Sequence, residues 1–170
     1  MPGINSDIKI LALVGSLRAR SINRQIAELA AAVSPDGVTV TVFEGLGELP
    51  FYNEDIDDAM NADAPPLAPV AALRAATADA DAALVVTPEY NGSIPAVVKN
   101  AIDWLSRPFG DGALKGKPLA VIGGSFGQYG GSRRAPTPRR TGRRTPRSPP
   151  MACLSARHRR TGETASRSRS

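Results

Sequence analysis

The sequence predicts one α/β domain, in which a parallel β-sheet lies between two layers of helices. Along the first 124 residues, short apolar runs of strand length alternate with segments of helical periodicity. The resulting order, β-α-β-α-β-α-β, requires right-handed crossovers that place helices on both faces of the sheet. A chain of 170 residues is long enough for one domain with a real core and too short for two comfortable ones.

The first half of this pattern contains two strands and one helix. Residues 8–14, IKILALV, form a mostly apolar run typical of a central strand that is covered on both faces. Residues 38–43, VTVTVF, alternate β-branched residues and indicate a strand nearer the edge. Between them, the helix predicted over 22–33 has its large apolar residues at helical spacing: Ile22, Ile26, Leu29 and Val33.

The second half repeats the pattern. We expect a helix over 67–79, a strand over 83–87, a helix from 95 to about 106 and a strand over 118–124. The inward residues of the first of these helices are Val70, Leu73 and Thr77. The apolar face of the second helix carries Val97, Val98, Ala101, Ile102 and Leu105. Its opposite face carries Lys99, Asn100 and Asp103.

Such sheets bind ligands at the carboxyl ends of their strands, and three loops that could contact a ligand follow those ends here. The first, GSLRARS over 15–21, leads into a helix N-terminus, whose free amides favour an anion. Arg18 can fork onto two phosphate oxygens. Neither a P-loop nor a GxGxxG motif is present, so a single phosphate suits this loop better than a dinucleotide. Taken alone, the loop could equally be an ordinary serine-capped helix start.

The second loop is PEYNGS, 88–93, and the third is GGSFGQYGG, 123–131. Tyr90 offers a flat apolar surface, while Asn91 and Gly92 let backbone amides approach a ligand closely. Alone, the second loop could be a plain turn and the third a flexible linker. Together with a phosphate at the first loop, a planar ring against these two describes flavin mononucleotide, FMN.

Four segments resemble the NADPH-dependent FMN reductase family, which includes chromate and quinone reductases. They are GSLRARSIN, LPFYNED (49–55), TPEYNGSIPAVVKNAIDWLSR (87–107) and GKPLAVIGGSFGQYGGSR (116–133), in the family's order. The resemblance covers about residues 8–133. It implies a flavodoxin-like three-layer α/β/α fold with a parallel sheet, bound FMN, NAD(P)H as co-substrate, and a homodimer or homotetramer.

The resemblance also implies the residues that hold the cofactor. Residues of the first loop and of the start of the following helix are implied to bind the phosphate: Gly15, Ser16, Arg18, Ser21 and Asn23. Residues of the second loop are implied to flank the isoalloxazine ring: Pro88, Glu89, Tyr90, Asn91, Gly92 and Ser93. Ser125 and Gly127 of the third loop line its other side.

Residues 1–133 contain no histidine and no cysteine, which leaves no Ser-His-Asp triad, cysteine nucleophile or thiolate zinc site there. A flavoenzyme needs none of these, since the cofactor carries the hydride chemistry. We therefore expect hydride transfer from NAD(P)H through FMN to a small-molecule acceptor: a quinone, azo compound, free flavin or chromate. We assign no catalytic side chain and no metal. The alternatives are a flavodoxin-like electron carrier without a nicotinamide reaction and an inactive truncated product.

The charge of +5 averages two unlike parts. Residues 1–133 carry 10 Lys and Arg against 15 Asp and Glu, whereas residues 134–170 carry 11 Arg and one acid. We interpret 1–133 as the FMN-binding domain, incomplete because its last strand and helix are missing, and 134–170 as a disordered Arg/Pro/Ser-rich tail. A shifted reading frame is favoured over a genuine basic tail.

The remaining expectations concern location and partners. The start of the chain has no signal-peptide pattern and no apolar run has membrane-spanning length, which favours a cytoplasmic protein. The single cysteine agrees with a reducing compartment. We do not expect nucleic acid as a partner, because 134–170 contains no aromatic residue on which a base could stack.

Overall fold

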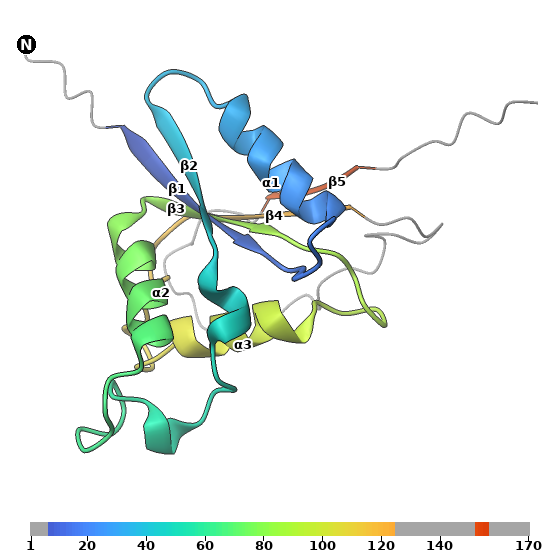
Figure 1. The fold of residues 1–170 in the computed structure, drawn as a ribbon. Coiled ribbons are helices and arrows are strands. Elements are labelled where there is room, and N and C mark those ends of the chain that lie inside the picture. The colour runs from blue at the N-terminus through green and yellow to red at the C-terminus, as the bar shows by residue number, and fades with distance from the viewer. Residues whose placement is uncertain (1–6, 125–151, 157–170) are drawn as a thin grey trace, which may run out of the picture.

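The computed structural model describes residues 7–124 and the backbone of residues 152–156. Its sheet is entirely parallel and has the strand order β2-β1-β3-β4-β5 (Figure 1). The strands are β1 (Ile8–Val14), β2 (Val38–Phe43), β3 (Ala82–Val86), β4 (Leu119–Gly124) and β5 (Ala152–Ala156). This order is the flavodoxin-like one, so the predicted α/β fold with a parallel sheet is confirmed.

Helices cover both faces of the sheet (Figure 1). The first face packs against α1 (Ile22–Ala32), and the second against α2 (Ala68–Asp79), α3 (Ala96–Leu105) and the short 3₁₀ helix η1 (Gly45–Glu48). A second 3₁₀ turn, η2 (Glu54–Ile56), lies in the long connection from β2 to α2. No helix in the described part of the chain is long and apolar enough to cross a membrane.

The contact stripe of α1 differs from the predicted one. Leu29 and Val33 are 61% and 68% exposed, whereas Asn23 and Ala27 are buried. Ala27 lets the helix approach the sheet closely because its side chain is small, and it packs with Ala12 and Val86. The apolar period was correct, but the face was rotated, since one small and one polar residue make the closest contacts.

The other two helices show which parts of the sequence pattern were reliable. In α2 the predicted inward residues Val70, Leu73 and Thr77 are all buried. In α3 the predicted face is buried at Val98, Ala101 and Leu105. The placement of Asn100 on the outer face was wrong, because Asn100 is only 8% exposed. Its amide satisfies the backbone of a neighbouring loop, as described below.

The expected loss of the last strand is corrected by β5, which pairs in parallel with β4 and places Leu154 opposite Ile122. The outer edge of β4 offers unpaired amides and carbonyls that a short segment can bond. Residues 151–154 contain the only large apolar side chains beyond residue 134, which makes this segment the best candidate to pair there. The predicted domain boundary at 133, and the rest of 134–170, lie outside the described residues.

Candidate functional site

The loops after β1 and β3 leave the sheet side by side, although these strands are not consecutive (Figure 1). The direction of the strand order reverses between them, and such a switch point is where flavodoxin-like sheets bind their ligands. The Gly15 amide donates to the Val86 carbonyl at 2.8 Å. A Cβ atom on Gly15 would collide with Thr87 Oγ1 and lie 2.7 Å from Val98 Cγ2. Glycine is therefore required where the first loop passes the second.

The first loop combines exposed and buried donors. Ser16 is half-buried, Arg18 is exposed, and Ser21 is only 3% exposed at the N-cap of α1. The Ser21 hydroxyl oxygen accepts from the Arg24 amide at 3.4 Å, which leaves its O–H able to donate. Within residues 7–124, no ion pair engages Arg18. Three of the predicted phosphate ligands can therefore still donate to an anion.

Asn23, another predicted phosphate ligand, is also bonded to the end of β4. It is 3% exposed, its Oδ1 accepts from the Gly124 amide at 3.0 Å, and its Nδ2 donates to the Gly124 carbonyl at 3.4 Å. The side chain thus joins the start of α1 to the end of β4. This contact fixes the position of the first loop relative to the third.

A cleft of about 270 Å³ opens on the β2 side of the first loop. It lies between the loop after β1 and the segment that connects β2 to η1. The cleft combines apolar and polar lining residues: Val14, Ser16, Leu17, Arg18, Ala19, Arg24, Phe43, Glu44 and Leu46. It therefore begins at the predicted phosphate loop and extends away from β3.

Two carboxylates hold Arg24 at the rim of this cleft. Its two terminal nitrogens donate to the two carboxylate oxygens of Glu44, at 2.7 and 2.5 Å, and its Nε donates to Glu28 at 2.9 Å. The hydrogen bonds from Arg24 hold the pKa of Glu44 below its ordinary value. Those from Glu44 and Glu28 raise the pKa of Arg24. Both side chains of the Arg24–Glu44 pair are therefore charged at neutral pH.

The second loop is a two-residue β-hairpin. The backbones of Tyr90 and Ser93 pair in both directions, at 2.9 and 3.0 Å. Asn91 and Gly92 between them have φ of 52° and 78°, the conformation of a type I′ turn, which Asn-Gly favours. Pro88 and Glu89 are half-buried, while Tyr90 to Ser93 are exposed. Tyr90 and the turn amides are thus accessible to a ligand.

The third loop begins beside the second. The Thr87 amide donates to the Ile122 carbonyl at 2.9 Å, and a Cβ on Gly123 would lie 2.8 Å from the Thr87 carbonyl oxygen. The predicted ring-lining residues Ser125 and Gly127 lie outside the described residues. The structure therefore shows where the third loop starts and no more of it.

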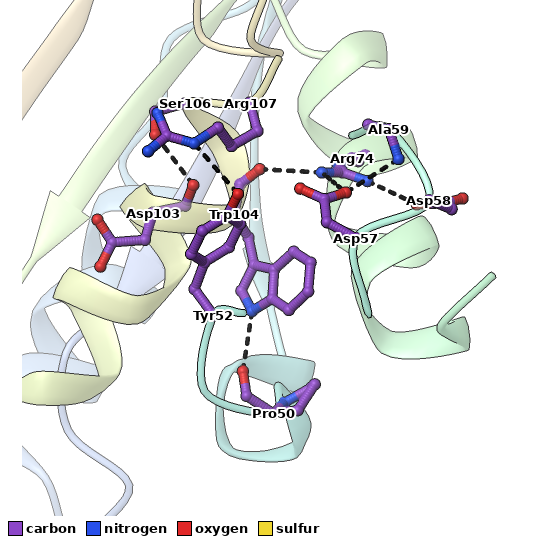
Figure 2. Close-up of polar contacts among 10 residues, drawn as sticks. All are labelled: Pro50, Tyr52, Asp57, Asp58, Ala59, Arg74, Asp103, Trp104, Ser106 and Arg107. Atoms are coloured by element: carbon purple, nitrogen blue, oxygen red, sulfur yellow. Dashed lines mark hydrogen bonds and ion pairs between the residues drawn. The ribbon is translucent and has the colours of Figure 1, made fainter. Parts of the chain in front are cut away.

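The loop over 49–53 is fastened to α3 by contacts that the sequence pattern did not reveal, among them a bond between Trp104 and Pro50 (Figure 2). Asn100 Oδ1 accepts from the Tyr52 amide at 2.9 Å, and its Nδ2 donates to the Pro50 carbonyl at 2.9 Å. Trp104 Nε1 donates to the same carbonyl at 2.8 Å. Asn100 and Trp104 lie four residues apart on the same side of α3. This asparagine–tryptophan spacing is the feature of the sequence that could have indicated the contact with the loop.

The same connection contains a buried carboxylate, Asp57, that faces Arg74 of α2 (Figure 2). Arg74 donates to Asp57 at 2.8 Å and to the more exposed Asp58 at 2.9 Å. It also lies 5.7 Å from the centre of the Trp104 ring. These contacts join the β2–α2 connection to both helices of that face. Among the described residues, no group of histidine, cysteine and acidic side chains is arranged to hold a metal ion.

Comparison with known proteins identifies relatives of this chain. The model of the NADPH-dependent FMN reductase family matches residues 8–143. A 2-hydroxy-1,4-benzoquinone reductase of Burkholderia sp. is 46% identical over 123 residues, which are 72% of this chain and 63% of that protein. An NAD(P)H-dependent FMN reductase of Pseudomonas aeruginosa is 40% identical over 130 residues, 76% of this chain and 66% of that protein.

A solved structure shares both sequence and fold. The flavoenzyme NAD(P)H:(acceptor) oxidoreductase FerB of Paracoccus denitrificans is 40% identical, with a TM-score of 0.62. The match covers 71% of this chain and 63% of FerB. The chain thus spans a little under two thirds of the length of these relatives.

Proposed function

The chain belongs to the NADPH-dependent FMN reductase family, and on that premise we propose that it is an NAD(P)H-dependent FMN-containing oxidoreductase. The observation that carries the proposal is the close approach of Gly15 to Thr87 at the switch point of the sheet. It brings a donor-rich loop next to a hairpin with an exposed tyrosine. A phosphate and a planar ring are the two parts of FMN that these loops suit.

We propose that the first loop holds the FMN phosphate. Ser16 and Arg18 supply a hydroxyl and a guanidinium, and Ser21 retains a hydroxyl proton for donation. Free amides at the start of α1 add to the favourable field for an anion. Asn23 fixes the loop against Gly124, and its Nδ2 keeps a second N–H that can donate to the phosphate.

We propose that the hairpin over 88–93 contacts the isoalloxazine ring. In the described part of the chain, the turn amides of Asn91 and Gly92 have no backbone partner, so they can donate to the polar edge of the ring. Tyr90 is 49% exposed and offers an aromatic surface beside it. Pro88 and Glu89 form the base of the hairpin, and Ser125 and Gly127 remain predicted contacts on the other side.

When bound, FMN supplies the hydride chemistry, and the protein supplies position and surroundings. The type I′ turn presents the amides of Asn91 and Gly92, which favour added negative charge on a ligand. No side chain among the described residues is needed as a nucleophile. NAD(P)H is the proposed reductant, in agreement with the printed names of the Pseudomonas and Paracoccus relatives.

We propose a quinone as the acceptor, because several relatives are named quinone reductases. Azo compounds, free flavin and chromate stay predictions. So do the cytoplasmic location, the homodimer or homotetramer, and the division of the chain at residue 133. The exposed Phe51 and Phe109, at 81% and 92%, support self-association, and light scattering of the purified protein would measure it.

Flavin binding tests the phosphate assignment. The chain should bind FMN more tightly than riboflavin, and Arg18→Ala should weaken FMN binding by about 1.5–3 kcal/mol while leaving riboflavin binding unchanged. Arg20→Ala, two positions away and also exposed, is the matched control and should have little effect. Quenching of flavin fluorescence measures each affinity. Equal affinity for the two flavins would show that the first loop does not bind the phosphate.

A further inference from the structure

The cleft between β1 and β2 is larger than the phosphate loop needs. The proposed FMN site uses only Ser16 and Arg18 of its lining, and the ring-binding loops follow β3 and β4, on the other side of β1. The rest of the cleft is formed by the remaining lining residues: Val14, Leu17, Ala19, Arg24, Phe43, Glu44 and Leu46. This part has no role in flavin binding as described above.

The lining of the cleft suits a flat ring joined to a hydroxylated group. Val14 and Leu46 form a buried apolar floor, and Phe43 is half-buried beside them. Two of the three charged lining residues, Arg24 and Glu44, form an ion pair. A volume of about 270 Å³ lies just below the range of about 300–1,000 Å³ for ligand pockets, so the cleft suits a part of a dinucleotide, such as one nucleoside, and not the whole.

The Glu44 carboxylate can accept hydrogen bonds from the hydroxyl groups of a ligand. Arg24 donates to both of its oxygens, which fixes its orientation, and each oxygen keeps a second lone pair. In dinucleotide-binding sheets, an acidic residue accepts from the ribose 2′-hydroxyl, and a nearby arginine accommodates a 2′-phosphate. Glu44 directly follows β2 and presents the first of these groups.

We infer that this cleft binds the adenosine half of the nicotinamide dinucleotide, with the base on the apolar floor and the ribose hydroxyls on Glu44. The inference rests on the proposed function, since it names where the co-substrate is anchored. The cleft shares Ser16 and Arg18 with the phosphate loop, so a dinucleotide held there extends across that loop toward the switch point.

The Arg24–Glu44 pair also sets the preference at the ribose 2′ position. A 2′-phosphate would meet the charged Glu44 carboxylate, because Arg24 is already occupied by Glu44 and Glu28. A free 2′-hydroxyl can donate to Glu44 without displacing Arg24. The cleft therefore favours NADH over NADPH.

The test is a calorimetric titration of the full chain with adenosine 5′-monophosphate (AMP), with and without saturating FMN. AMP should bind in both conditions, more weakly once FMN occupies Ser16 and Arg18, and the amide NMR shifts that AMP causes in the FMN-loaded protein should concentrate at residues 43–46. Adenosine 2′,5′-bisphosphate should bind more weakly than AMP. NAD⁺ should displace AMP from the FMN-loaded protein.

The two glutamates that bond Arg24 provide a test variant and its control. Glu44→Gln should weaken AMP binding about tenfold, the scale of one hydrogen bond to a charged group, and should strengthen binding of the 2′,5′-bisphosphate. Glu28→Gln also removes an ion pair to Arg24 but lies outside the cleft lining. It should leave both affinities unchanged.

Several outcomes would overturn the assignment: no AMP binding to the FMN-loaded protein, shifts away from the cleft, or equal effects of the two variants. Displacement of AMP by FAD but not by NAD⁺ would assign the adenylate to a flavin dinucleotide instead. AMP binding as described, in a protein that NAD(P)H does not reduce, would refute the proposed function and leave the nucleoside site standing.

Discussion

The side chain of Asn23 bonds the backbone of Gly124 in both directions, accepting from its amide at 3.0 Å and donating to its carbonyl at 3.4 Å. These two residues are 101 positions apart, at the start of α1 and the end of β4. The pair sets the spacing of the first and third loops of the candidate site. The side chain predicted to bind the phosphate is thus also a structural link.

Asn23→Ala should lower the free energy of unfolding by about 1–3 kcal/mol, because it leaves buried polar groups of Gly124 unpaired. Urea denaturation followed by circular dichroism measures this. Gln25→Ala, on the exposed side of the same helix, is the control and should change stability by less than about 0.5 kcal/mol. Equal effects of the two variants would contradict the link.

Asp57 and Asp58 offer a second matched pair, since both bond Arg74 but only Asp57 is fully buried. Asp57→Ala should cost about 3–5 kcal/mol, because it removes the fully buried partner of Arg74 and leaves Arg74 only the more exposed Asp58 as an ion-pair partner. Asp58→Ala should cost no more than about 1 kcal/mol, since its side chain is 37% exposed. Thermal and urea unfolding of the two variants compare them directly. Similar losses would show that burial does not decide the strength of this pair.

Gly15→Ala tests the close approach at the switch point. The added methyl group would meet Thr87 and Val98, so we expect a loss of about 1–3 kcal/mol in stability and weaker FMN binding. Gly47→Ala is the control, because its Cβ would meet only the flexible end of Leu17, at 3.3 Å. Unfolding and flavin titration measure both effects. A Gly15→Ala protein that binds FMN normally would contradict the proposed placement of the two loops.

The Arg24–Glu44 pair predicts a pH dependence of stability. Its hydrogen bonds lower the pKa of Glu44 in the folded state. The contribution of the pair is therefore complete above the unfolded pKa of about 4.3, and is lost as the pH falls through the lower folded pKa. Glu44→Gln should thus lower stability slightly at about pH 7 and hardly at all at about pH 2. Glu48→Gln, exposed on η1, is the control, and a loss from Glu44→Gln that does not change with pH would contradict the pair.

The sequence predicted the first four strands and the three α-helices to within about one residue, because each has a clear apolar period. It failed where polar side chains are buried. The predicted place of Asn100 was the outer face of α3. It is buried instead, because its side chain forms hydrogen bonds with a loop about 50 residues earlier in the chain. Such long-range partners leave no local pattern.

The candidate site was predictable in part for a similar reason. The hairpin over 88–93 follows from Asn-Gly, whose preference for positive φ is local. The cleft beside Glu44 was not predicted, because it forms only when the segment after β2 packs next to the loop after β1. The strand β5 was missed because five residues of modest apolarity show no period of their own.

The most direct test of the account is reduction of the FMN-loaded chain by NAD(P)H in the absence of oxygen. One equivalent of reductant should bleach the oxidised-flavin absorbance, and a quinone added afterwards should restore it. A protein that binds FMN but is bleached only by dithionite would be a flavodoxin-like electron carrier. That result would contradict the proposed oxidoreductase.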